Sequence, residues 1–189
     1  MNKTLIAAAI LATAGAAAHA EIATYAVDPT HTFANFEANH MGASTLRGRF
    51  DKKEGTVTLD KSAKNGKAEI TIDATSISTG VPALDTHLRS KDFFNAAEIG
   101  TAKFTADKFG FAGDKVNEVS GTLTLLGKTQ PVTLKANNFN CYISPMLKRE
   151  VCGGDFETTL VRSQYGMTYA QNFMSDNVHL LIQIEAIKQ

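Results

Sequence analysis

The stretch KAEITIDAT, residues 67–75, decides the fold because apolar and polar side chains alternate along it without a break. Ala68, Ile70 and Ile72 would share one face of a strand, and Glu69 would lie on the other. This two-residue period is typical of a β-strand that buries one face. The same period recurs at 32–38, 57–59, 102–106, 119–125, 132–136 and 178–186. The chain is therefore expected to be mainly β.

Turn signals separate the predicted strands. Asn65-Gly66 and Gly127-Lys128 are typical of short connections between antiparallel neighbours. Two segments depart from the pattern, and we predict a helical excursion at about 76–94 and a shorter one at about 162–169. About eight strands with one apolar face must either stack as two sheets or close on themselves, and closure removes exposed edges. We therefore predict an eight-stranded antiparallel barrel.

The strand faces predicted to point inward carry many small side chains. An eight-stranded barrel can hold one small ligand, and a filled interior would need more side-chain volume than Ala and Gly supply. The alternative is that bulky partners such as Phe139, Phe156 and Phe173 fill the core. The residues predicted to line a cavity are Ala34, Phe36, Ile70, Ile72, Phe104, Ala106, Leu123, Leu134, Phe156, Met167, Phe173 and Ile182.

The first 20 residues have the pattern of a cleaved signal peptide. Lys3 precedes an apolar run at 5–18, and the sequence AHA at 18–20 is a small-x-small cleavage pattern. The run is shorter than the roughly 20 apolar residues of a membrane span. We therefore predict cleavage after Ala20 and a periplasmic protein, with secretion or surface exposure as alternatives. Residues 21–189 fit one domain.

Charge and cysteine content narrow the function classes. The chain has 19 Lys and Arg against 19 Asp and Glu. Because a nucleic-acid binder usually shows a basic excess, no nucleic-acid partner is predicted. Cys141 and Cys152 both lie in the exported part, so a disulfide is predicted. A metal pair or a redox dithiol is the alternative, but there is no Cys-x-x-Cys and no nearby His, and no metal site is predicted.

No catalytic motif stands out. Gly-x-Ser-x-Gly, Ser-x-x-Lys and a phosphate-binding glycine loop are absent. Segment 84–94 places His87 and Arg89 beside two aromatic residues. It can be interpreted as a head-group site at an apolar mouth, or as a helix that packs under the barrel. Arg162 could pair with a ligand oxygen or bridge to an acid such as Asp92.

Four groups of motifs follow one another along the chain: Tyr25-x-Val27-Asp28-x-x-His31 with Phe36, His40 and Gly48-x-Phe50; His87-Leu88-x-Ser90-x-Asp92-Phe93-Phe94; Gly121-x-Leu123-Thr124-x-x-Gly127; and Arg162-Ser163-x-Tyr165-Gly166-Met167. Together they resemble the bacterial YceI-like family, from about Tyr25 to Ile187. The resemblance implies a lipocalin-like barrel, usually periplasmic, that encloses an isoprenoid lipid such as a polyprenyl quinone. It implies binding rather than catalysis, and no covalently bound cofactor. The cysteine pair is not a general feature of the family.

A hydrocarbon tail would supply most of the affinity, since each buried methylene contributes about 0.8 kcal/mol. A head group would need one or two placed donors, for which the candidates are His87, Arg89, Arg162 and Tyr165. The main prediction is a carrier or store for an isoprenoid lipid that makes transient membrane contact. A dimer is compatible with a hydrophobic mouth, although no residue singles out an interface.

Two other functions stay open. An envelope enzyme acting on such a lipid would use His87 with Asp85 or Asp92 for proton transfer. A surface interaction protein would use the barrel as a scaffold and the loop between Cys141 and Cys152 as its epitope.

Overall fold

The computed structural model describes residues 22–189, and the predicted signal peptide lies outside this range. The strands are β1 (Ala23–Val27), β2 (Phe33–His40), β3 (Ser44–Phe50), β4 (Lys53–Asp60), β5 (Asn65–Asp73), β6 (Ile77–Ser78), β7 (Thr101–Ala112), β8 (Lys115–Leu125), β9 (Lys128–Ile143), β10 (Glu150–Val161) and β11 (Met174–Lys188). The helices are α1 (Pro82–Arg89) and the 3-10 turns η1 (Ala74–Ser76) and η2 (Arg162–Tyr165). Within residues 22–189, every helix is too short to cross a membrane.

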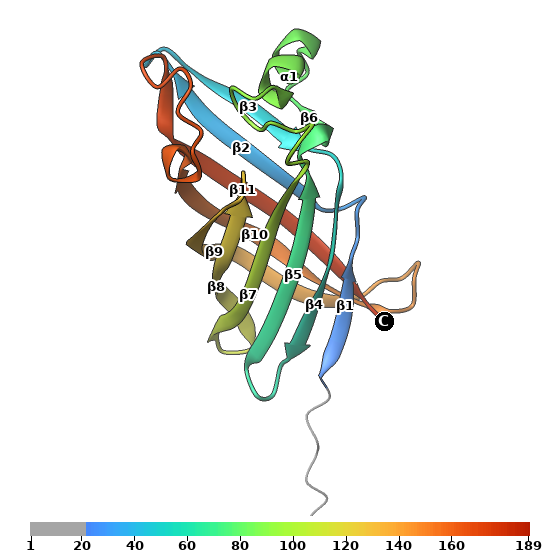
Figure 1. Cartoon of the computed structure of the whole chain (residues 1–189). Coiled ribbons are helices and arrows are strands. Elements are labelled where there is room, and N and C mark those ends of the chain that lie inside the picture. Colours follow the sequence, from blue (N-terminus) through green and yellow to red (C-terminus); the bar gives the residue numbers. More distant parts are fainter. Residues whose placement is uncertain (1–21) are drawn as a thin grey trace, which may run out of the picture.

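Eight of the strands close into an antiparallel barrel (Figure 1). Their order around the ring is β1-β4-β5-β7-β8-β9-β10-β11, and β11 pairs with β1 to complete it. Sequential neighbours such as β4 and β5 are joined by short turns; this one lies at residues 61–64, and Asn65 and Gly66, predicted as the turn, begin β5. The predicted eight-stranded barrel is confirmed, because two stacked sheets would not pair β1 with β11.

β11 contacts two different strands along one edge. Its C-terminal part pairs with β1, where Tyr25 lies opposite Lys188, and its earlier part pairs with β2, where Ala38 lies opposite Val178. β2 pairs with β3, and β3 pairs with β6. These three strands were not predicted as a separate unit. They leave the ring at the end where α1 lies in Figure 1, so the sheet splays open there.

The 67–75 stretch forms most of β5. Ala68 is buried opposite Val57 and Ala106, as its alternation predicts. The strand ends at Asp73 because its carboxylate accepts hydrogen bonds from the backbone N–H of Thr75 at 2.8 Å and from the hydroxyl of Thr75 at 2.6 Å. This capping interaction begins η1 instead of extending the strand.

The two helical excursions are shorter than predicted. Within 76–94, only Pro82–Arg89 is helical, and Ile77–Ser78 is strand β6. Pro82 suits the first turn because it lacks an N–H that would be left unpaired there. The second excursion is limited to η2, which ends at Gly166 with a φ of 87°, a left-handed conformation that glycine adopts without strain.

Cys141 and Cys152 form the predicted disulfide. They lie opposite each other in the register of β9 and β10, with Cα atoms 4.0 Å apart. The bond lies at the base of the hairpin whose tip, residues 144–149, projects beside the C-terminal end in Figure 1. Disulfides persist mainly in oxidising compartments, so the bond is consistent with an exported protein.

Candidate functional site

An apolar cavity occupies the barrel interior as two adjoining chambers. The deep chamber has a volume of about 140 Å³ and is lined by strands of the closed ring. The outer chamber has a volume of about 490 Å³ and extends under α1 towards the splayed end. Residues that line both chambers are Ala34, Ile72, Leu123, Leu180 and Ile182. The chambers therefore meet at this level and form one elongated site.

The deep chamber has hydrocarbon walls, and its polar side chains are already engaged. The hydroxyl of Thr32 donates to the carbonyl oxygen of Glu185 at 3.1 Å and accepts from the N–H of Glu185 at 3.1 Å. The ammonium group of Lys53 donates to the carbonyl oxygen of Asp51 and lies 4.3 Å from the ring centroid of Phe33. Burial lowers the pKa of Lys53. This chamber suits a hydrocarbon tail.

Residues 82–100, which comprise α1 and the following turns, cover the outer chamber, and we call this segment the lid. Aromatic contacts hold it in place. The ring of Phe50 lies 5.9 Å from that of Phe36 and 5.3 Å from that of Phe94, so the lid is held against β2 and β3. Gly48 permits this arrangement, because a Cβ atom at that position would collide with the ring of Phe36.

A second group of rings joins the lid to the loop before β11. The ring centroid of His87 lies 5.1 Å from that of Phe93 and 5.5 Å from that of Tyr169, and the rings of Phe93 and Tyr169 are 5.4 Å apart. All three residues line the outer chamber. Side-chain packing thus holds the lid on two sides.

The rim of the outer chamber, formed by Met41 and Phe173, exposes apolar surface. The side chains are 64% and 55% exposed, and the N–H of Met41 donates to the carbonyl oxygen of Phe173 at 2.8 Å. Both residues also line the chamber. The hydrocarbon surface of the cavity therefore continues to the outside of the protein at this end.

Arg162, a predicted head-group contact, lines the outer chamber, but the protein itself already occupies its guanidinium. Its guanidinium donates to the carbonyl oxygens of Met167, Tyr169, Met174 and Ser175 at 2.7–3.4 Å. Only 5% of the residue is exposed, and burial lowers its pKa. Asp92 is not its partner, because Asp92 lies beside His87. Arg162 fastens the loop that precedes β11.

Tyr165 is enclosed more completely than any other predicted head-group residue. It is 2% exposed, lines the outer chamber and packs with Leu123 and Val132. Within residues 22–189, its hydroxyl is the buried side-chain polar atom that has no hydrogen-bond partner. An unpaired buried hydroxyl costs about 1 to 3 kcal/mol. Burial also raises the pKa of Tyr165, so the phenol stays protonated at neutral pH.

His87 and Arg89 lie on α1 but face different surroundings. His87 lines the outer chamber, and its Nε2 lies 3.3 Å from a carboxylate oxygen of Asp92. Arg89 lines neither chamber and donates to the carbonyl oxygen of Ile77 at 3.3 Å. Arg89 therefore ties the helix to β6, in agreement with the packing interpretation of this segment.

The predicted cavity residues, except Ala106, line one chamber or both. Ile70, Phe104, Leu134 and Phe156 line the deep chamber, Phe36, Met167 and Phe173 the outer one, and Ala34, Ile72, Leu123 and Ile182 both. Ala106 lines neither chamber but is buried in the apolar core cluster that also contains Ala68 and Val119. Phe139 and Phe156 line the deep chamber instead of filling it.

Sequence reasoning missed several lining residues from outside the regular strand pattern. Phe50, Tyr169 and Met41 belong to the outer chamber. Phe50 was quoted as part of a motif, but nothing in its spacing indicated the packing against Phe94. Tyr169 and Met41 lie in turns, where a two-residue period gives no information about direction.

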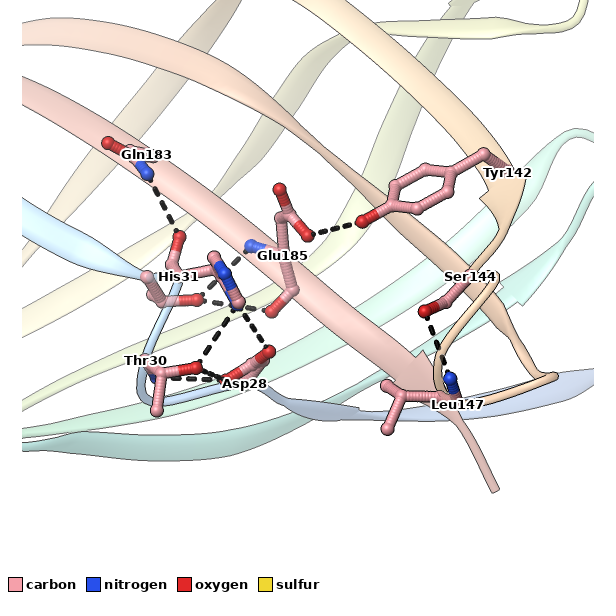
Figure 2. Close-up of polar contacts among 9 residues, drawn as sticks. Asp28, Thr30, His31, Tyr142, Ser144, Leu147, Gln183 and Glu185 are labelled. Carbon is pink, nitrogen blue, oxygen red and sulfur yellow. Dashed lines mark hydrogen bonds and ion pairs between the residues drawn. The ribbon is translucent and has the colours of Figure 1, made fainter.

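A separate polar cluster lies on the outer surface at the turn between β1 and β2 (Figure 2). Nδ1 of His31 lies 2.8 Å from a carboxylate oxygen of Asp28, and Thr30 donates its N–H and its hydroxyl to Asp28. Gln183 of β11 donates to the carbonyl oxygen of His31 at 3.2 Å. The His31 ring is thus paired with a carboxylate, and the cluster fastens the turn to β11.

Comparisons with known proteins agree with this architecture. Residues 25–186 match the model of the YceI-like domain. A UPF0312 protein of Pseudomonas aeruginosa (strain LESB58) is 34% identical over 192 residues, and Protein YceI of Salmonella arizonae is 34% identical over 195 residues; each alignment covers 100% of both chains.

Solved structures share the fold. BcnA of Burkholderia cenocepacia has a TM-score of 0.69 and 23% identity, over 85% of this chain and 99% of that chain. A polyisoprenoid binding domain from Saccharophagus degradans, implicated in plant cell wall breakdown, has a TM-score of 0.64 and 18% identity, over 89% of this chain and 100% of that chain. Because the domain model spans most of the chain and the curated relatives align along its whole length, the chain belongs to the YceI-like family.

Proposed function

We propose that this protein binds an isoprenoid lipid inside its barrel and carries or stores it. The observation that carries the proposal is the elongated apolar cavity, whose deep chamber lies among the ring strands and whose outer chamber reaches an apolar rim. The polyisoprenoid binding domain of Saccharophagus degradans, which has the same fold, supports the choice of ligand class.

The energetics favour a long hydrocarbon. Each methylene transferred from water to the cavity contributes about 0.8 kcal/mol. Several isoprene units would offset the translational and rotational freedom lost on binding without strong polar contacts. The ligand class includes polyprenyl quinones, bound without a covalent link to the protein.

The site suits binding better than catalysis. Of the two acids predicted to work with His87, Asp85 accepts hydrogen bonds from the N–H and the hydroxyl of Thr79 at 2.7 and 2.6 Å. Only Asp92 lies beside the imidazole, and both side chains are partly exposed at the edge of the outer chamber. An apolar cavity with one such pair at its edge favours a carrier over an enzyme.

The rim would collect the lipid from a membrane surface. Met41 and Phe173 expose hydrocarbon that is continuous with the cavity wall, so a tail could pass from a bilayer to the chamber with little contact with water. The disulfide supports a location outside the reducing cytoplasm, which for this family of carriers we take to be the periplasm.

Native mass spectrometry of protein purified from the exported fraction tests the function. We expect a co-purifying apolar molecule whose fragments differ by isoprene units. A reproducibly empty protein that also excludes apolar dyes would contradict the proposal.

A substitution at the junction of the chambers tests the location of the ligand. Ala34→Phe places a ring where the chambers meet, and we expect it to reduce the amount of bound lipid severalfold. Ala112→Phe, at an exposed position next to the β7–β8 turn, is the matched control and should keep the lipid. Equal lipid content in both variants would place the ligand elsewhere.

A further inference from the structure

The hydroxyl of Tyr165 points to the chemistry of the ligand's polar end. The phenol ring lines the outer chamber, and the residue is 2% exposed. Among residues 22–189 it carries the buried side-chain oxygen that no protein group pairs. Because the group is sealed from bulk solvent, a partner has to lie inside the barrel with it.

Three other polar residues that line the cavity have partners from the protein. Arg162 donates to four backbone carbonyl oxygens, and Thr32 is paired with the backbone of Glu185. His87 lies at the partly exposed edge, beside Asp92. Tyr165 therefore differs from each of them in being both enclosed and unpaired.

We propose that the Tyr165 hydroxyl donates a hydrogen bond to an uncharged acceptor oxygen, such as a ketone or quinone carbonyl, at the polar end of the bound isoprenoid. This inference rests on the proposed function, and it names which isoprenoids the site prefers. A phenol that stays protonated is a donor, so it pairs with an acceptor and not with a second donor.

An uncharged head group fits these surroundings better than a phosphate. Leu123, Leu125 and Leu160 are among the neighbours of Tyr165, and an anion placed there would lose its hydration without a free ion pair. Arg162, a buried cation that lines the same chamber, already donates most of its N–H groups to carbonyl oxygens. The site should therefore discriminate carbonyl-bearing isoprenoids from prenyl phosphates.

Three probes with the same farnesyl tail test the inference: farnesene, a hydrocarbon; farnesylacetone, a ketone; and farnesyl phosphate. With the wild-type protein, we expect the ketone to bind more tightly than the other two. Tyr165→Phe removes only the hydroxyl, and we expect it to weaken ketone binding about five- to tenfold while farnesene binding stays within about twofold. Tyr142→Phe, which removes a hydroxyl bonded to Glu185 on the outer face, is the matched control.

The thermal stability of the empty Tyr165→Phe variant separates a ligand role from a structural one. Because the hydroxyl has no partner in the protein, its removal should leave the melting temperature unchanged or higher. Equal losses for ketone and hydrocarbon, an unchanged ketone affinity, or tightest binding of the phosphate would overturn the inference. Failure of the wild type to bind any of the three probes would instead contradict the proposed function.

A measurement on the wild-type protein covers the case in which Tyr165→Phe does not fold. The Tyr165 hydroxyl proton is enclosed and should exchange slowly enough to be seen by NMR. Farnesylacetone should move this resonance downfield, and farnesene should not. Identical spectra with the two probes would refute the hydrogen bond.

Discussion

Arg162 and Tyr165 show how packing decides the role of a polar residue. Both were predicted as head-group contacts because each carries a donor. In the fold, the guanidinium of Arg162 is used by four carbonyl oxygens, whereas the hydroxyl of Tyr165 is left without a protein partner. Residue type supplies the donor, but the path of the loop around Arg162 determines which donor stays available to a ligand.

The pair of Asp28 and His31 predicts a measurable titration at the residue scale. Burial acts to raise the pKa of Asp28, but hydrogen bonds from Thr30 and His31 outweigh it and lower that pKa to about 2. The hydrogen bond to Asp28 and its charge raise the pKa of His31 above 6.5. Protonated His31 stabilises the folded state fully below the pKa that it has in the unfolded chain, and this contribution is lost as pH rises through its folded-state pKa. Ionised Asp28 stabilises the folded state above pH 3.8, and this contribution is lost as pH falls towards 2.

An NMR titration of the His31 ring protons checks this pair. We expect Asp28→Asn to lower the pKa of His31, since it removes the negative charge next to the imidazole. Asp114→Asn, in the β7–β8 turn, is the control and should leave the titration unchanged. A His31 curve that is the same in all three proteins would show that the contact does not form in solution.

At the scale of elements, the lid depends on a few aromatic contacts. The Phe94 ring packs edge-on against Phe50 of β3, and the N–H of Phe94 donates to the carbonyl oxygen of Leu88. Such a ring pair contributes about 0.5–1.5 kcal/mol beyond the area it buries. The lid is therefore held weakly compared with the continuous hydrogen bonding of the ring strands.

Phe94→Ala should loosen the lid without unfolding the barrel. We expect faster amide hydrogen exchange at 82–95, unchanged exchange in β8–β11, and dissociation of bound lipid about three- to tenfold faster. Phe33→Ala, which removes a ring of β2 that contacts Arg49 and lines neither chamber, is the matched control. If lipid dissociation is equally fast in wild type and Phe94→Ala, the lid does not control release.

The elements were predictable to different degrees, for physical reasons. The alternation of apolar and polar residues correctly predicted β5 and the other ring strands, because each of them buries one face and the two-residue period is repeated many times. It overestimated the helical segment at 76–94, because β6 forms only through pairing with Arg49 and Phe50 of β3, a contact that local spacing does not encode.

At the scale of the whole molecule, the two ends of the barrel have different surfaces. The lid end exposes Met41 and Phe173 at the rim. The opposite end carries the β9–β10 hairpin, where Met146 is 89% exposed but lines neither chamber (Figure 1). Two exposed methionines at opposite ends thus allow a matched comparison of membrane contact.

Met41→Ser should slow the uptake of a prenyl quinone from phospholipid vesicles about three- to tenfold, because less hydrocarbon would then contact the bilayer. Affinity for the same lipid in detergent solution should change little. Met146→Ser should leave the uptake rate at the wild-type value. A larger effect from Met146→Ser would mean that the hairpin end, and not the rim, contacts the membrane.

The pairing of β1 with β11 also constrains the order in which the protein can fold. Tyr25 of β1 lies opposite Lys188 of β11, so the ring needs strands from both extremes of the described sequence. Before β11 pairs, the other strands can form only an open, curved sheet with two unpaired edges. Such edges favour aggregation with other chains and a need for chaperones. Pairings this distant in sequence also make folding slow. Lipid binding in the proposed cavity therefore requires that β11 has already paired with β1.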